Sequence, residues 1–190
     1  MQGRNWRVSI LSSSHENIAL YIDGSCLENQ NVTAETPAAW GMAIVIGDNG
    51  LGKGSGEILE ETWGRVICKP NAEEFIGAEV GSNNTAELTA FAMALRWLLI
   101  DDSEYPAIIY TDSQYAGNLA TGAWRAKANK SLVKHVQNLW QEVAQVRTVE
   151  WRHVRAHRGH RWNERADHLA NRCVNNQLPI PLTFWKPGQR

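Results

Sequence analysis

The order of strand-like and helix-like segments is the feature that most limits what this chain can fold into. Five short runs have the apolar or alternating character of strands, at residues 18–22, 40–46, 54–59, 106–111 and 148–154. Apolar residues at helical spacing predict helices over residues 85–100, 132–146 and 163–174, and Asp112-Ser113 begins a shorter one. Residues 60–82 are expected to form a long loop with pieces of strand. This order predicts an α/β protein with a mixed five-stranded sheet flanked by helices.

Charge is distributed unevenly along the chain. Residues 1–112 contain 16 acidic and 6 basic side chains, a net charge of −10, whereas residues 113–190 contain 4 acidic and 13 basic ones, a net charge of +9. The formal net charge of −1 therefore conceals two opposed halves. A basic half is compatible with a nucleic-acid partner even though the chain as a whole is almost neutral.

The composition is that of a globular protein, with 43% hydrophobic and 21% charged residues. The longest apolar stretch, residues 88–100, contains Arg96 and is too short to span a bilayer, so no membrane association is expected. The three cysteines form no CxxC pair, which argues against a disulfide framework or a cysteine zinc site. We expect a reducing intracellular compartment, cytoplasmic or nuclear. The arginines and serines of the first 15 residues leave a mitochondrial destination open.

Two aspartates stand where predicted strands end. Asp23 follows Ile18-Ala-Leu-Tyr-Ile22, and Asp112 follows Ile108-Ile-Tyr-Thr111. Ligand sites of open α/β sheets gather at such strand ends. Each aspartate also has an ordinary structural explanation, because Asp before Gly is common in turns and Asp before a helix is a common N-cap. The residues alone leave both interpretations open.

Glu87 and Asp167 are the other acidic candidates, and each lies in a predicted helix. Asn84-Thr-Ala-Glu87 has the pattern of a capping box with Asn84 as N-cap, but a glutamate in a first turn could also reach the two aspartates. Asp167 lies at the border of a buried helix face and needs a partner, either Arg165 or another base, or a metal ion. Several carboxylates gathered at one point need a cation to stay ionised, and their hard oxygens favour Mg²⁺ or Mn²⁺ over zinc.

The spacing of His153, His157 and His160 leaves a zinc site as an alternative. However, the predicted strand turns His153 and His160 apart, and no cysteine lies close to complete a tetrahedral site. We therefore expect His160 to brace its loop through hydrogen bonds, and Asn163 with Glu164 to cap the last helix.

Four short motifs combine these residues. They are Asp23-Gly-Ser25, Ser82-Asn-Asn-Thr-Ala-Glu87, Tyr110-Thr-Asp-Ser-Gln-Tyr115 and Val154-Arg-Ala-His-Arg-Gly-His160-Arg-Trp-Asn-Glu-Arg-Ala-Asp167-His-Leu-Ala170. In this order they resemble type 1 ribonuclease H and cover most of residues 18–174. The run His-x-Gly-His followed by Asn-Glu-x-x-Asp is the most specific of them. The resemblance implies a ribonuclease H-like fold.

The resemblance also implies an activity, the hydrolysis of the RNA strand of RNA–DNA hybrids to 5′-phosphate and 3′-hydroxyl ends. It implies that two Mg²⁺ ions, for which Mn²⁺ is a substitute, are bound by Asp23, Glu87, Asp112 and Asp167. His157 matches the flexible-loop histidine of the family, which is thought to assist proton transfer or product release. An imidazole that titrates near neutrality suits that work.

The expected partner is an RNA–DNA hybrid, and the resemblance implies which positions contact it. Those expected along the RNA strand, where they read 2′-hydroxyls and minor-groove edges, are Gly24, Ser25, Asn84 and Gln114. Ser82 is expected to contribute to a phosphate pocket. Tyr115 and Trp124 match positions that pack against deoxyriboses of the DNA strand, with core packing as the alternative for both.

Two departures from the family concern the DNA strand. Lys134 or His135 stands where the family often has an asparagine that binds a DNA phosphate. Residues 122–130 are too few for the full basic handle that many cellular members carry, although Arg125, Lys127 and Lys130 remain. We expect weaker hybrid binding than in relatives with a handle, or help from a fused domain.

The expected domain organisation is a flexible N-terminal segment at residues 1–16, a ribonuclease H domain at 17–176 and a C-terminal tail at 177–190. The chain is expected to act as a monomer or as a domain of a larger polyprotein. One alternative is another nuclease of the ribonuclease H-like superfamily, but such nucleases lack the His-x-Gly-His run. The other is a non-catalytic hybrid-binding module of a retroelement polyprotein, which gains nothing from four carboxylates beside a phosphate backbone.

Overall fold

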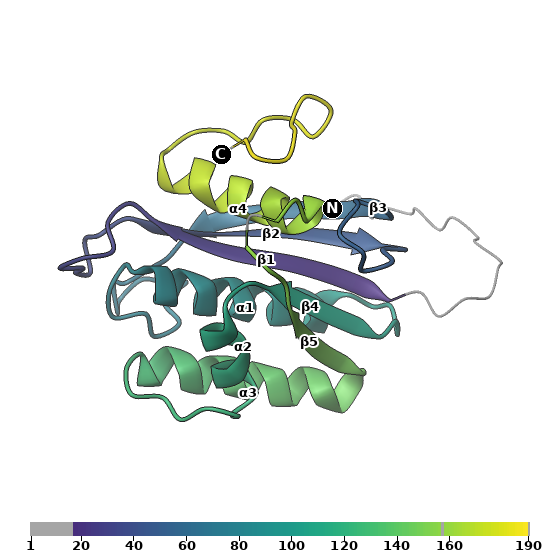
Figure 1. The fold of residues 1–190 in the computed structure, drawn as a ribbon. Coiled ribbons are helices and arrows are strands. Elements are labelled where there is room, and N and C mark those ends of the chain that lie inside the picture. The colour runs from purple at the N-terminus through teal and green to yellow at the C-terminus, as the bar shows by residue number, and fades with distance from the viewer. Residues whose placement is uncertain (1–16, 157, 190) are drawn as a thin grey trace, which may run out of the picture.

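The computed structural model describes residues 17–156 and 158–189. Five strands form one sheet, β1 Ile18–Cys26, β2 Ala38–Ile46, β3 Glu57–Arg65, β4 Ala107–Thr111 and β5 Val149–His153. The helices of this part of the chain are α1 Asn83–Ile100, α2 Gln114–Ala120, α3 Lys130–Val146 and α4 Arg161–Val174. Figure 1 shows α1, α2 and α3 on one side of the sheet and α4 on the other. The predicted mixed five-stranded sheet flanked by helices is confirmed.

The strand order in the sheet is β3-β2-β1-β4-β5. Strand β2 is antiparallel to both β1 and β3, whereas β4 is parallel to both β1 and β5. The first seven residues of the central strand β1 are all buried. A strand that is covered by helices on both faces has a nearly continuous apolar sequence. The apolar run at the start of β1 therefore predicts this burial on both faces.

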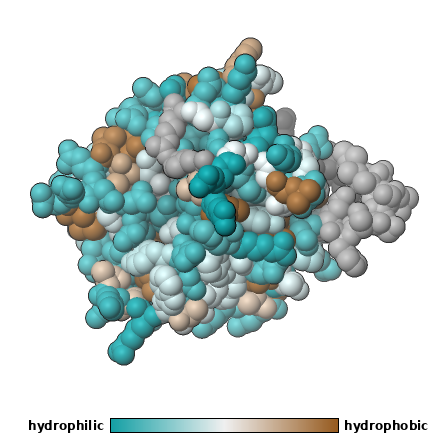
Figure 2. All heavy atoms as spheres, in the orientation of Figure 1, coloured by the Kyte–Doolittle hydropathy of each residue, from teal (hydrophilic) through white to brown (hydrophobic). Residues whose placement is uncertain are grey.

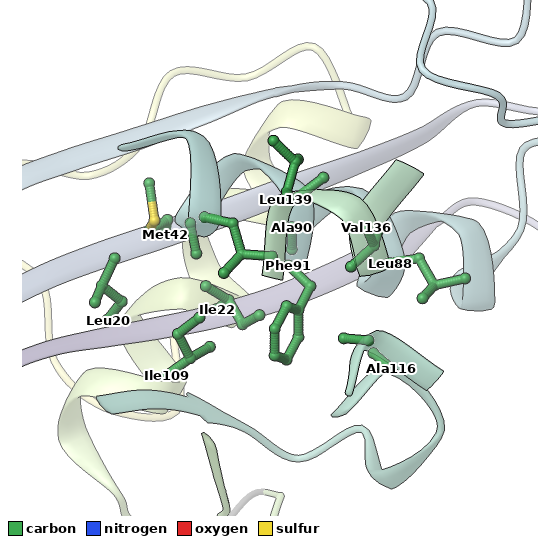
Figure 3. Packing of buried hydrophobic residues seen from close by; sticks show 14 of the residues in the cluster. Leu20, Ile22, Met42, Leu88, Ala90, Phe91, Ile109, Ala116, Val136 and Leu139 are labelled. Atoms are coloured by element: carbon green, nitrogen blue, oxygen red, sulfur yellow. The ribbon is translucent and has the colours of Figure 1, made fainter. Parts of the chain in front are cut away.

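The side chains of β1 alternate between two cores. Leu20 and Ile22 pack with Phe91 of α1 in the larger cluster, which Figure 3 shows from close by. Ala19 and Tyr21 point to the opposite face and belong to the smaller cluster beneath α4. This division follows from the two-residue period of a strand. Each large apolar side chain that is fully buried contributes about 1.5–3 kcal/mol to folding.

Two glycines let the helices approach the sheet closely. A Cβ atom on Gly24 would lie 2.4 Å from the backbone nitrogen of Glu87, and one on Gly41 would lie 2.4 Å from the carbonyl oxygen of Ala166. Neither obstacle is a flexible side-chain end, so any larger residue would push a helix away. Glycine at these positions therefore sets the depth at which α1 and α4 sit on the sheet.

The third strand is longer than its sequence predicts. The apolar pattern indicated a strand at residues 54–59, but β3 runs to Arg65, through part of the region predicted as a loop. Its pairing with β2 continues past residue 59, with Trp40 opposite Gly64. Backbone hydrogen bonds to a buried neighbour hold this segment in the sheet although half of its residues are polar.

The caps of two helices also differ from expectation. Ser82, not Asn84, is the N-cap of α1, and Thr85 completes the capping box where Glu87 was predicted to do so. The last helix begins two residues before the predicted start of residue 163, and its N-cap residue makes no side-chain hydrogen bond. Asn163 is buried without capping it, while Glu164 accepts a hydrogen bond from the backbone of Gly159. The sequence pattern therefore identified the right regions for the helix starts but not the residues that cap them.

The segment predicted as a C-terminal tail packs against α4. Arg165 is buried, pairs through two hydrogen bonds with Glu61 of β3 and donates a third to the carbonyl of Ile180. His168 accepts a hydrogen bond from the backbone of Ile180, and the buried ring of Trp185 lies against both His168 and the Arg165 guanidinium. Ile180 and Trp185 therefore anchor this segment to α4, although Leu178 and Phe184 are exposed. The predicted flexible segment 1–16 lies outside the described residues.

None of the helices in the described part of the chain has both the length and the apolar content that crossing a bilayer requires. Figure 2 shows a largely hydrophilic face on which hydrophobic residues form small separate groups.

We expect Trp185→Ala to lower the free energy of unfolding by about 3–5 kcal/mol, because the indole is 3% exposed and its removal leaves a cavity beside a buried arginine. The neighbouring Phe184 is 76% exposed and provides a matched control, so Phe184→Ala is expected to cost less than about 0.5 kcal/mol. Denaturant unfolding measures both values. Equal losses in the two variants would contradict the packing of this segment.

Candidate active site

The four acidic candidates come from four different elements and meet at one edge of the sheet. Asp23 lies in β1 and Asp112 directly follows β4, and because these strands are parallel neighbours their C-terminal ends lie together. Glu87 projects from the first turns of α1, and Asp167 from the middle of α4. All four line a hollow of about 300 Å³, together with Gly24, Ser25, Cys26, Asn83 and Asn171. We refer to this as the carboxylate hollow.

Three of the carboxylates are close enough to share a ligand. Oxygen atoms of Asp23, Glu87 and Asp112 all lie within 4.8 Å of one another. Asp167 lines the same hollow outside this group of three, and its charge is felt at Asp23. The four side chains therefore surround one small volume, and Asp23 interacts with the other three.

Burial and mutual repulsion both disfavour the ionised forms of these groups. The pKa of Asp23 is raised well above its usual value, first by burial and then by the charges of Asp112 and Asp167. The pKa of Glu87 is raised in the same way, by burial and by the charges of Asp23 and Asp112. Among the hydrogen bonds, one at 2.7 Å from the backbone N–H of Gly24 to Asp23 Oδ1 favours the ionised form.

The donor set fits a divalent metal ion. Glu87 Oε2 is buried and has no hydrogen-bond partner among the described residues. An acceptor without a donor, surrounded by further carboxylates, is costly unless a cation balances it. Carboxylate oxygens are hard ligands, which suit Mg²⁺ or Mn²⁺ better than zinc.

The ordinary structural explanations for three of the acids are wrong. Asp23 lies within a strand that continues to Cys26, so it is not a turn residue. The N-cap of α2 is Ser113, whose side chain accepts a hydrogen bond from Ala116, so Asp112 is not the cap. The capping box of α1 does not use Glu87, as described above. Arg165, one of the partners considered for Asp167, directs its guanidinium to Glu61 instead.

The structure places the predicted substrate contacts around the carboxylate hollow and along α2 and α3. Gly24 and Ser25 line the hollow, Ser82 begins α1, and Asn84 and Gln114 are exposed at the starts of α1 and α2. Sequence reasoning missed Cys26, Asn83 and Asn171, which also line the hollow. Of these, Asn171 could have been found, because it stands four residues after Asp167 and thus on the same helix face.

The aromatic and basic candidates have different surroundings. Tyr115 is half-buried against the larger core cluster, and its hydroxyl accepts a hydrogen bond from Asn129, so core packing accounts for part of its environment. Trp124 is 47% exposed on the loop after α2. Together with Lys134 it lines a broad hollow of about 620 Å³, whose other residues include Arg125 and Lys130.

His160 does not brace its loop as expected. Neither ring nitrogen has a hydrogen-bond partner in the described structure. The ring packs instead against two tyrosines, with centroids 5.1 Å from Tyr21 and 6.4 Å from Tyr110. The metal-binding group found among the described residues does not include His153 or His160. His157 lies outside the described residues.

Comparison with known proteins agrees with the motifs. The sequence model of the RNase H family matches residues 15–175. The chain belongs to the RNase H family. Family members named Ribonuclease H include that of Anaplasma marginale (strain St. Maries), 33% identical over 175 residues that cover 86% of this chain and 94% of the relative. That of Janthinobacterium sp. (strain Marseille) is 35% identical over 170 residues, with coverage of 84% and 96%.

Solved structures of the RNase H family share this fold. RNase H1 from the halophilic archaeon Halobacterium salinarum NRC-1 has a TM-score of 0.60 and 24% identity, covering 84% of this chain and 98% of its own. The PFV RNase H domain has a TM-score of 0.59 and 17% identity, covering 87% and 98%. The predicted ribonuclease H fold and the assignment to ribonuclease H enzymes are confirmed.

In the absence of divalent cations, we expect Asp23→Asn to raise the thermal midpoint near neutral pH. Because the folded-state pKa of Asp23 is raised, ionising this group in the hollow destabilises the folded state once the pH exceeds the unfolded-state pKa, about 4. For a chain of this size, each kcal/mol of relief corresponds to roughly 2–4 °C. The gain should therefore be large near pH 7 and shrink as the pH is lowered to about 4.

Thermal unfolding in a chelating buffer across this pH range measures the effect. The exposed Asp102 supplies the control, and Asp102→Asn is expected to leave the midpoint unchanged. A midpoint for Asp23→Asn at or below that of the parent at pH 7 would contradict the repulsion described here.

Proposed function

We propose that the chain hydrolyses the RNA strand of RNA–DNA hybrids, leaving 5′-phosphate and 3′-hydroxyl ends, with two bound Mg²⁺ ions that Mn²⁺ can replace. The observation that carries this proposal is the carboxylate hollow, where four acidic side chains from four elements surround one volume. Membership in the RNase H family supplies the class of reaction. The hollow supplies the charge that such a reaction requires.

The residues that would hold the ions are Asp23, Glu87, Asp112 and Asp167. Two divalent ions, when bound, activate a water on one side of a phosphodiester and stabilise the leaving oxygen on the other. Asp23 would contribute to holding them together with the other three acids, because oxygen atoms of Glu87 and Asp112 lie within 4.8 Å of an Asp23 oxygen and Asp167 acts on Asp23 electrostatically. The backbone N–H of Gly24 donates a hydrogen bond to one oxygen of Asp23 and so restrains this carboxylate beside the hollow.

His157 is proposed to move a proton during cleavage or to help release the product. In the sequence it lies between β5 and α4, the helix that carries Asp167. An imidazole can both accept and donate a proton near neutral pH, which is what either role needs.

Discrimination for hybrids is proposed to come from the surface beside the hollow. The RNA-strand contacts are Gly24, Ser25, Asn84 and Gln114, with Ser82 near a phosphate. Trp124, Lys134 and Tyr115 are assigned to the DNA strand. The hollow beneath Trp124 supports this assignment, because it combines an exposed indole with the cations Arg125, Lys130 and Lys134. Aromatic rings and cations in one groove suit a sugar-phosphate backbone.

We expect Asp112→Asn to reduce cleavage of an RNA–DNA hybrid at least about 100-fold, because the loss of even an outer contact to a metal site commonly costs 10- to 100-fold. The matched control is Asp102→Asn, an exposed aspartate on the loop before β4, which is expected to retain full activity. The parent should cut matched RNA–RNA and DNA–DNA duplexes far more slowly than the hybrid. Equal cutting of all three duplexes, or full activity of Asp112→Asn, would refute the proposed function.

We expect His157→Ala to slow cleavage by about 10²–10⁴-fold if this histidine transfers a proton in the rate-limiting step, with hybrid affinity unchanged. Single-turnover and steady-state rates separate the two roles. A defect in both indicates proton transfer, whereas a defect in the steady state alone indicates product release. Normal rates in both experiments would remove His157 from the mechanism.

A further inference from the structure

A second hollow lies on the α4 side of the sheet, between the loop that joins β2 to β3 and the segment that precedes α4. Its volume is about 140 Å³, and it is lined by Leu51, Gly52, Lys53, Arg155, Arg158, Gly159 and His160. It shares none of its lining residues with the carboxylate hollow. We refer to it as the basic hollow.

Lys53, Arg155 and Arg158 bring three positive charges to the basic hollow from two distant parts of the sequence. All three side chains are exposed, and none takes part in an ion pair within the described structure. Like charges gathered without a counterion repel one another, so their proximity has no evident benefit for folding. An anionic ligand would turn this repulsion into binding.

The loop that carries Lys53 is held in place on both sides of the lysine. The carbonyl of Gly52 accepts a hydrogen bond from the backbone of Arg161, at 3.0 Å. The carbonyl of Ser55 accepts one from the indole nitrogen of Trp162, at 2.8 Å. Because both donors belong to the start of α4, the loop and the helix form one unit, and Lys53 stays opposite the arginines.

Two glycines make this close contact possible. Gly52 has φ +76°, and a Cβ there would lie 2.8 Å from the imidazole of His160. Gly54 has φ +80°, and a Cβ there would lie 2.0 Å from the side chain of Arg161. Glycine is required at both positions, because the backbone is left-handed and no Cβ atom would fit. These two glycines therefore let the loop lie close to the segment that begins α4.

The acids that face the same region already have partners. Asp48 accepts hydrogen bonds from the hydroxyls of Tyr21 and Ser55, and Glu164 accepts one from the backbone of Gly159. Their hydrogen bonds support the loop and the start of α4. Neither acid forms an ion pair with Lys53, Arg155 or Arg158 in the described structure.

We propose that the basic hollow binds a backbone phosphate of the hybrid substrate, away from the bond that is cleaved. This inference rests on the proposed function. Arg155 and Arg158 belong to the segment between β5, which ends at the active-site edge, and α4, which carries Asp167. A duplex that reaches past the carboxylate hollow presents further phosphates, and arginine and lysine are the side chains that bind them.

A nucleotide site is the nearest alternative, because Gly47 to Lys53 has the glycine and lysine spacing of a P-loop. However, that motif joins a strand to a helix and has Ser or Thr after the lysine. Here Gly54 follows Lys53, and the loop joins two antiparallel strands. Free phosphate is the other source of the same chemistry, so the experiment includes it.

The test measures hybrid binding by fluorescence anisotropy over a range of salt concentrations, with Asp112→Asn in every protein to prevent cleavage. Two hybrids are compared, one of about two helical turns and one of about half a turn, at roughly 10 base pairs per turn. Lys53→Gln and Arg158→Gln are the test variants, and Lys69→Gln, an exposed lysine outside the hollow, is the charge-matched control. Thermal unfolding verifies that all variants are folded.

For the long hybrid, Lys53→Gln and Arg158→Gln are each expected to weaken binding several-fold and to flatten the slope of log K against log salt by about one. The short hybrid should bind these variants and the control alike. Slopes equal to that of Lys69→Gln would overturn the inference while leaving the proposed function intact. A parent that binds no hybrid at all would refute both.

Calorimetry with inorganic phosphate distinguishes the remaining source. If phosphate binds the parent but not Lys53→Gln, while hybrid binding of the variant is unchanged, the basic hollow takes a free anion and the inference is wrong. If phosphate binding is negligible and hybrid binding is weakened, the inference is supported.

Discussion

The main physical constraint on this structure is the repulsion among its buried carboxylates, which the rest of the fold has to counteract. Asp23 and Glu87 are almost fully buried, and with Asp112 their oxygens lie within 4.8 Å of one another. Folding alone gains nothing from this arrangement, because each group is desolvated and faces like charges. The rest of the fold must therefore hold these side chains together against their repulsion. A divalent cation is the ligand that would relieve it.

The means of holding them is close packing of helices on the central strands. Gly24 and Gly41 leave no room for a side chain, so α1 and α4 lie deep against opposite faces of the sheet and bring Glu87 and Asp167 to the end of β1. The segment after α4 supports this from outside, through Arg165 and Trp185. The packing of the helices on the sheet thus supplies the stability that offsets the repulsion among the carboxylates. Such a division is common where function requires an unfavourable local arrangement.

The distribution of charge has a tertiary counterpart. Three of the four acids of the carboxylate hollow come from the acidic part of the sequence. Two groups of exposed cations lie apart from these acids. Arg125, Lys130 and Lys134 line the hollow with Trp124, and Lys53, Arg155 and Arg158 line the basic hollow. Under the proposed function, these cations would attract a polyanionic substrate that the carboxylates by themselves would repel. Metal ions held by the carboxylates would offset that repulsion.

The sequence by itself determined the order of elements, the mixed sheet and the family, because apolar periodicity and motif spacing are local properties. It also singled out four acids, two of them at predicted strand ends, but Asp23, Glu87 and Asp112 each matched a turn or cap equally well. Only the tertiary structure showed that Ser82 and Ser113 cap the helices and that the acids line one hollow. It alone decided the extent of β3, the packing of Ile180 and Trp185 against α4, and the meeting of Lys53 with Arg155 and Arg158 in one hollow. Each of these depends on contacts between residues far apart in the chain, which no local pattern encodes.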